Sequence, residues 1–229
     1  MKDECPRQAI SSSQRLLASK AFVWLATLAI EFCVVIPAGA EFAEANVETL
    51  AGSIARVRVV NDNRRPTNGS AVAVRENMVV TSCHGTRNAS LISVMNGGQR
   101  WQVKSVTRDG EHDLCLLELS EANLKPFPLA EPSTTLELGD YVAAVGFAGP
   151  TLTIAEGTVK ALHQHDNARV IQTDAAFRIG ESGGALVNRE GKLVGILTFY
   201  LAGEKEGAYF ALPAAWVERL VQSAVSRQA

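Results

Sequence analysis

One serine, Ser182, lies within the glycine-rich segment 180–184 (GESGG). Glycines let the backbone adopt conformations that would clash with a Cβ, and they let a substrate approach closely. Such a turn can aim the N–H groups of Gly180 and Ser182 at one point, which is what stabilising a tetrahedral oxyanion requires. The segment predicts a nucleophile with an oxyanion hole, and a plain turn is the alternative for this motif taken alone.

A serine hydroxyl is a weak nucleophile unless a base takes its proton. His84 is the candidate base, because it ends the apolar run 78–83 and begins a polar loop, where a side chain can face a cleft. His163 and His165 lie in a polar stretch that we interpret as a solvated loop. His112 precedes an apolar run and is interpreted as a surface or turn residue.

The base in turn needs a group that holds its tautomer. Asp113 begins the apolar run 114–119, where a carboxylate is costly to bury unless it is paired. The ring N–H of His84 would supply that pairing. Asp174, a short distance before Ser182, is the rival for this role.

Two cysteines flank these candidates. Cys83 directly precedes His84, and Cys115 follows Asp113 by two positions, on the same face of a strand. If His84 touches Asp113, the two sulfurs are neighbours and a disulfide is expected, with two buried thiols as the alternative. No cluster of Cys and His has the spacing of metal ligands, so neither a metal nor a cofactor is expected.

The first forty residues have the composition of a targeting sequence rather than of a folded domain. A basic, serine-rich opening leads into the apolar run 21–36, which Glu31 interrupts, and into the small residues 37–40 (PAGA). The run is shorter than the roughly 20 apolar residues of a spanning helix. We therefore predict a signal peptide over 1–40 and an exported, periplasmic or secreted domain over 41–229, with a retained anchor as the alternative. After cleavage no stable membrane insertion is expected, and an exported location permits a disulfide.

Composition limits the partners. The 229 residues are 47% hydrophobic and 20% charged, which excludes a disordered chain, and the net charge of −2 provides no general basic surface for nucleic acid.

The elements that must position the candidates are mostly short. Apolar runs of four to seven residues, bounded by Gly, Asn, Asp or Pro, are typical of an all-β barrel or sandwich. Turns are expected at 75–77 and 188–191. One helix is expected after Pro213, taken as its first position, with Trp216 and Leu220 on its apolar face.

Several segments resemble the trypsin-like serine peptidases, and within them the protease domain of the HtrA/Deg group. They are residues 69–74 (GSAVAV), 79–84 (VVTSCH), 113–117 (DLCLL), 209–213 (YFALP) and, above all, 171–188 (IQTDAAFRIGESGGALVN). The resemblance covers about residues 50–221. It implies two perpendicular six-stranded antiparallel β-barrels with the active site between them and a C-terminal α-helix.

The resemblance also implies a function. His84, Asp113 and Ser182 would form a catalytic triad, the N–H groups of Gly180 and Ser182 the oxyanion hole, and proteins or peptides the substrates. No oligomeric state is predicted.

The specificity pocket implied by the resemblance lies near Ala176, Phe177, Thr198, Phe199 and Tyr200. Ala176 stands where specificity for basic side chains needs an aspartate. Small or aliphatic residues are therefore expected before the scissile bond.

Three departures favour a second hypothesis. Glu181 stands where the HtrA pattern has Asn, Gly85 follows His84 where the family usually has an apolar residue, and no PDZ module follows in this sequence. The alternative is a catalytically weak or inactive protease-fold protein that binds peptides or partner proteins.

Overall fold

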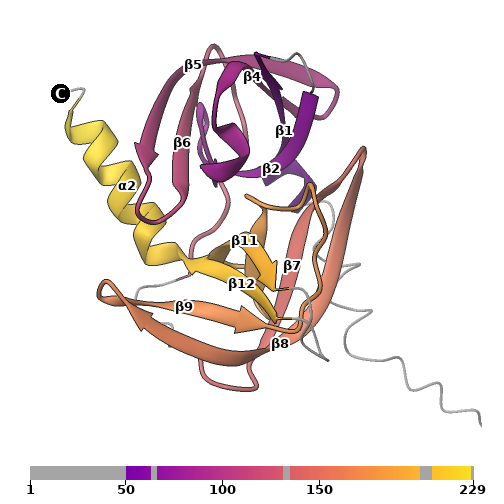
Figure 1. Cartoon of the computed structure of the whole chain (residues 1–229), viewed down its shortest axis with the longest axis vertical. Coiled ribbons are helices and arrows are strands. Elements are labelled where there is room, and N and C mark those ends of the chain that lie inside the picture. The colour runs from indigo at the N-terminus through magenta and orange to yellow at the C-terminus, as the bar shows by residue number, and fades with distance from the viewer. Residues whose placement is uncertain (1–49, 63–65, 131–134, 202–207, 228–229) are drawn as a thin grey trace, which may run out of the picture. The chain divides into compact units, whose positions relative to one another are not determined.

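The computed structural model describes residues 50–62, 66–130, 135–201 and 208–227, without the side chains of 200 and 201. The predicted signal peptide lies outside these residues. Within them, twelve strands form two closed antiparallel barrels of six strands each (Figure 1). The predicted all-β architecture with two barrels is confirmed.

The first barrel has the strand order β1-β2-β3-β6-β5-β4. Its strands are β1 (Ile54–Asn61), β2 (Pro66–Arg75), β3 (Met78–Ser82), β4 (Ala89–Asn96), β5 (Gln99–Asp109) and β6 (Leu114–Leu119). Small and β-branched side chains fill its interior, among them the fully buried Val57, Val79 and Val94. The turn expected at 75–77 joins β2 to β3.

The second barrel has the strand order β10-β11-β12-β9-β8-β7. Its strands are β7 (Tyr141–Ala148), β8 (Thr151–His165), β9 (Ala168–Thr173), β10 (Ala185–Asn188), β11 (Leu193–Leu201) and β12 (Ala208–Pro213). The turn expected at 188–191 joins β10 to β11, and Gly191 has the positive φ of 70° that such a turn favours.

Two strands do not have the composition of the short apolar runs expected from the sequence. β5 and β8 are partly exposed along most of their length, so polar residues alternate with apolar ones. The interpretation of His163 and His165 as members of a solvated loop was wrong, because both lie in β8. A strand with one solvent-exposed face is harder to recognise from its sequence than a strand buried on both faces, because fewer of its residues are apolar.

The helix α2 (Ala214–Ser226) packs against β6 of the first barrel and against β11 and β12 of the second (Figure 1). Trp216 and Leu220 are buried on its inner face, as predicted. Pro213 is the N-cap and not the first helical residue, because its ψ of 143° is extended. The helix therefore fastens the two barrels to each other through one continuous apolar cluster.

Candidate active site

The glycine-rich turn carrying Ser182 is pressed against the first barrel. Gly180 and Gly183 have φ of 102° and 85°, a region that side chains with a Cβ rarely adopt. A Cβ on Gly183 would lie 2.2 Å from the backbone oxygen of Ser70. Only glycine fits this approach, which explains the motif physically.

Ser70 of β2 fastens this turn to the first barrel. Its N–H donates to the Ser182 carbonyl at 2.9 Å, and its hydroxyl donates to the Gly180 carbonyl at 2.9 Å. The same hydroxyl oxygen accepts the N–H of Phe147 at 2.8 Å. Ser70 is fully buried, and the reasoning from sequence gave it no role, although it lies in a segment that carries the family resemblance.

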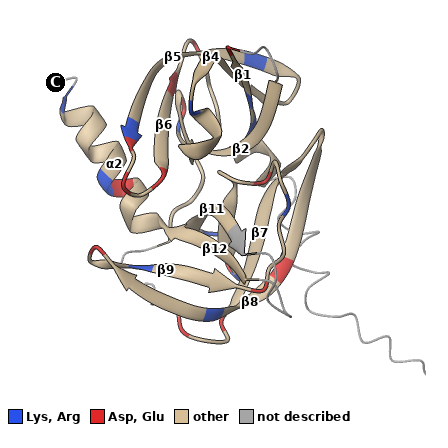
Figure 2. Ribbon diagram, in the orientation of Figure 1, with Lys and Arg blue, Asp and Glu red and all other residues tan. Residues whose placement is uncertain are grey.

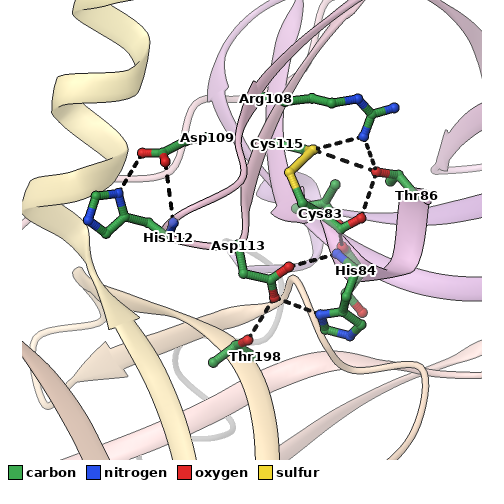
Figure 3. Close-up of a disulfide and its surroundings, with 11 residues drawn as sticks. Cys83, His84, Thr86, Arg108, Asp109, His112, Asp113, Cys115 and Thr198 are labelled. Atoms are coloured by element: carbon green, nitrogen blue, oxygen red, sulfur yellow. Dashed lines mark hydrogen bonds and ion pairs between the residues drawn. A yellow bond between two sulfur atoms is a disulfide. The ribbon is translucent and has the colours of Figure 1, made fainter.

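His84 and Asp113 meet at the edge of the first barrel. His84 begins the short 3-10 helix η1 (His84–Thr86), and Asp113 directly precedes β6. The His84 ring Nδ1 lies 2.6 Å from Asp113 Oδ2, and the His84 backbone N–H donates to Asp113 Oδ1 at 2.7 Å (Figure 3). Thr198 of β11 donates its hydroxyl to the same Oδ2 at 3.0 Å. Both barrels therefore hold this carboxylate.

The environment keeps Asp113 ionised. Burial by itself raises the pKa of a carboxyl group, but the hydrogen bonds from His84 and Thr198 and the charge of the His84 ring outweigh it. They hold the pKa of Asp113 below its usual value. A carboxylate in contact with Nδ1 fixes the ring orientation and favours the tautomer that leaves Nε2 as an acceptor.

A disulfide joins the two segments that carry these residues. Cys83 and Cys115 are bonded with their Cα atoms 4.9 Å apart, as predicted (Figure 3). Both cysteines are buried. Arg108 covers the bridge, with one guanidinium nitrogen 3.0 Å from Thr86 Oγ1 and 3.4 Å from Cys115 Sγ.

Ser182 shares a cavity with His84 without bonding to it. Its hydroxyl donates to the Thr198 carbonyl at 2.9 Å. Among the described residues, no hydrogen bond joins Ser182 to His84. Both residues, together with Gly180, line one cavity of about 450 Å³ between the barrels.

The backbone donors expected at the oxyanion hole are not engaged elsewhere. Within the part of the chain that the structure describes, neither the Gly180 N–H nor the Ser182 N–H donates a hydrogen bond. The N–H of Glu181, between them, donates to the Arg178 carbonyl at 3.0 Å. Two donors beside the cavity are thus left for a ligand.

The residues expected in the specificity pocket separate into two groups. Thr198 and Phe199 line the cavity, whereas Ala176 is exposed and Phe177 is buried against Tyr209, with ring centroids 5.2 Å apart. The side chain of Tyr200 lies outside the described part of the structure.

Ile179 lines the same cavity and is 84% exposed, so an apolar side chain flanks the site without packing of its own. Nothing in the sequence pattern singled it out; its position directly before Gly180 was the available signal.

Asp174, the rival partner for the base, is engaged within the second barrel. Its Oδ1 accepts the backbone N–H of Thr158 at 2.6 Å, and its Oδ2 lies 2.7 Å from Lys160 Nζ. Burial raises its pKa, but these bonds hold the pKa below its usual value. The structure pairs His84 with Asp113 instead.

Glu181, which directly precedes Ser182, carries a buried carboxyl group. It is 2% exposed, and its Oε1 lies 2.8 Å from the Thr153 hydroxyl. Gly146 makes room for it, because a Cβ on that glycine would lie 2.9 Å from the Cβ of Glu181. The second barrel therefore accommodates the Glu181 side chain, which is larger than the Asn of the HtrA pattern.

The described residues contain no group of three or more His, Cys, Asp or Glu that could hold a metal ion. No helix among them is long and apolar enough to cross a membrane.

Comparison with known proteins was made by sequence and by structure. The sequence model for a trypsin-like peptidase domain matches residues 69–196. The periplasmic serine endoprotease DegP of Salmonella typhimurium is 37% identical over 167 residues, which cover 69% of this chain and 35% of the relative. Its Escherichia coli K12 counterpart is 36% identical over 167 residues. The chain thus spans about a third of the length of these curated relatives.

Solved structures agree with the architecture. The serine endoprotease from Yersinia pestis has a TM-score of 0.70 at 29% identity, over 82% of this chain and 69% of that one. The Rv3671c protease from M. tuberculosis, active form, has a TM-score of 0.72 over 80% of this chain and 85% of that one. Its 18% identity limits the second likeness to the fold.

Proposed function

Because this chain belongs to the trypsin-like peptidase domain family, we propose that it is a serine endopeptidase that hydrolyses peptide bonds with Ser182, His84 and Asp113. One observation carries the proposal. The His84 ring is held by Asp113 through Nδ1 at 2.6 Å, and the ring and Ser182 line one cavity. This leaves Nε2 of His84 as the proton acceptor for a nucleophile in that cavity.

In the proposed reaction, rotation about the Cα–Cβ bond of Ser182 breaks the bond to the Thr198 carbonyl and turns Oγ toward His84. Oγ attacks the peptide carbonyl while His84 takes its proton, and the imidazolium later donates that proton to the leaving amine. Asp113, already ionised, stabilises the imidazolium. The N–H groups of Gly180 and Ser182 bind the oxyanion, where losing one such donor typically costs ~10²–10³ in turnover.

The site favours small or aliphatic side chains before the scissile bond. Ala176, six positions before the serine, carries no carboxylate for a basic side chain, although it does not line the cavity. The cavity wall carries Thr198, Phe199 and the exposed Ile179. A panel of chromogenic peptides should show the highest kcat/KM after Ala, Val or Leu, and preferred cleavage after Arg would overturn this specificity.

We place the enzyme outside the cytoplasm, in the periplasm or secreted, after removal of residues 1–40. Three observations support this location: the apolar leader, the Cys83–Cys115 disulfide, and relatives that are named periplasmic endoproteases. N-terminal sequencing of the exported protein should begin at Glu41.

A fluorophosphonate probe tests the activity directly, because it reacts only with an activated serine. Wild-type protein should be labelled at Ser182, and the Ser182→Ala variant should not be labelled. Folded wild-type protein that resists labelling and cleaves no peptide would contradict the proposal.

One observation favours the second candidate, a protease-fold protein that binds peptides without hydrolysing them. The Ser182 hydroxyl is bonded to the Thr198 carbonyl and not to His84. Under this alternative, wild type and Ser182→Ala bind a peptide equally and neither is labelled. Labelling of wild type therefore decides between the two functions.

A further inference from the structure

His112, which directly precedes Asp113, is held between two carboxylates. Its Nδ1 lies 2.8 Å from Asp109 Oδ2, and its Nε2 lies 3.0 Å from Asp166 Oδ2. The side chain is only 10% exposed. Figure 3 shows the Asp109 contact beside the His84–Asp113 pair.

A neutral imidazole has one donor and one acceptor nitrogen, so it can satisfy only one of two flanking carboxylates. The imidazolium ion has two donors and satisfies both. The ring also packs on the indole of Trp216, with centroids 4.1 Å apart, an arrangement that favours a cation. Both contacts are hydrogen bonds only when the ring carries two N–H groups.

Further ionisable groups lie near the ring, among them Arg87 in the lining of the adjoining cavity. Arg219 of α2 also donates to the Asp166 carboxylate, at 2.9 Å. Arg219 and His112 therefore share this carboxylate. The His165 ring of β8 lies 6.1 Å from the His112 ring, and Glu111 lines the adjoining cavity of about 430 Å³. Both ring nitrogens of His112 nevertheless face carboxylates.

The contacts of His112 with Asp109 and Asp166 join the two barrels. Asp109 ends β5 of the first barrel, whereas Asp166 lies in the turn between β8 and β9 of the second. The helix α2 fixes that turn, because Trp216 donates its indole N–H to the Asp166 carbonyl at 3.3 Å. His112 thus fastens the turn that carries Asp113 to the opposite barrel and to α2.

Asp113 needs such support. Its φ is 52°, in the left-handed region, where a residue other than glycine is held only if its surroundings define it. On the other side, the N–H of Cys83 donates to the Asp113 carbonyl at 2.9 Å. Asp113 is therefore held by the first barrel through Cys83, and by the second through the Thr198 hydroxyl and through its neighbour His112.

We propose that His112, held between Asp109 and Asp166, is a positioning residue that keeps Asp113 aligned with His84 by fastening the Asp113 turn to the second barrel. The proposal rests on the proposed function, in which Asp113 orients the base. Without the imidazole, the turn loses the bridge from Asp109 to Asp166, and Asp113 keeps only its own bonds to His84, Cys83 and Thr198. The carboxylate is then less firmly aligned with His84.

The test compares His112→Gln with His163→Gln at 25 °C. Gln at 112 can keep one carboxylate bond but carries no charge; His163, bonded to Gln172 at 2.9 Å on exposed β8, contacts neither Asp109 nor Asp166. We expect His112→Gln to lower kcat about 10-fold, less than the ~100-fold that a 1 Å misplacement can cost. KM should stay within about 2-fold, because no substrate contact is removed. His163→Gln should leave both constants unchanged.

One further readout distinguishes positioning from a general loss of structure. The far-downfield proton resonance of the His84–Asp113 hydrogen bond, assigned by its loss in Asp113→Asn, should weaken in His112→Gln and persist in His163→Gln. A folded His112→Gln protein with wild-type kcat, or with an unchanged resonance, overturns the proposal.

Asp166→Asn supplies a second variant if His112→Gln does not fold, since Asp166 lies in a turn and its side chain is 41% exposed. It should weaken the same resonance, and an unchanged resonance there again overturns the proposal. If wild type is not labelled by a fluorophosphonate, the proposed activity fails. The resonance still decides whether His112 positions Asp113.

Discussion

The two halves of the candidate site are held by different kinds of interaction. In the first barrel, two hydrogen bonds to an ionised carboxylate and a covalent bridge hold His84 and Asp113. In the second, neutral backbone hydrogen bonds and positive-φ glycines hold the Ser182 turn, and its hydroxyl points at the Thr198 carbonyl. The candidate base is therefore already oriented, whereas the Ser182 hydroxyl would have to rotate to reach it. Charge and covalent bonds fix one half, and close packing fixes the other. Acidic and basic residues themselves are scattered over both barrels (Figure 2).

The largest expected effect comes from removing the charge of the first half. Asp113→Asn keeps the shape of the side chain but presents an amide to His84, which favours the wrong tautomer. We expect kcat to fall ~10⁴-fold, or about 5 kcal/mol, by analogy with the general triad mechanism. Steady-state kinetics on a peptide substrate measure this loss. Asp174→Asn is the matched control, and a comparable loss there would reassign the orienting residue.

The covalent bridge comes next. Replacing both Cys83 and Cys115 by Ala removes a cross-link between residues 32 positions apart, and roughly 3–4 kcal/mol of unfolding free energy should be lost in the chain-entropy account. Urea denaturation of the oxidised wild type and the double variant measures the difference. Equal midpoints and slopes would show that the first half does not depend on its bridge.

The second half should be most sensitive to added volume. Gly183→Ala places a methyl 2.2 Å from the Ser70 carbonyl and demands a positive φ from alanine. Overpacking and backbone strain together should cost about 3 kcal/mol. The same urea titration tests this, with Gly110→Ala as control, because a Cβ there meets nothing within 4 Å. Equal losses in the two variants would remove close packing as the explanation.

Prediction from the sequence was most successful where a structural role admits only one kind of residue. Short buried strands have unmistakable composition, and the GESGG segment is readable because only glycine tolerates the approach to Ser70. Pairing of Cys83 with Cys115 followed from placing His84 beside Asp113.

Contacts between residues far apart in the chain could not be predicted from the sequence. Ser70 has no local signal, because its task is to bond a turn more than a hundred positions away. The role of His112 depends on Asp166, which the second barrel brings to it from a distant turn. β8 was missed because its exposed face replaces apolar residues by polar ones. Which partner a polar side chain finds is decided by topology and not by its neighbours in the chain.

The smallest expected effect is a pH dependence that separates the two halves. The pKa of Asp113 is lower in the folded protein than its unfolded value of about 3.9. The stabilisation from its ionised form is therefore fully present above that unfolded value, and it is lost as the pH falls through the lower folded pKa. The unfolding free energies of wild type and Asp113→Asn should differ at pH 6 and converge as the pH is lowered toward 2, measured by urea denaturation at each pH. The difference between wild type and Gly183→Ala should stay constant over this range, because packing carries no proton. A wild-type advantage over Asp113→Asn that persists at pH 2 would show that shape, not charge, stabilises the first half.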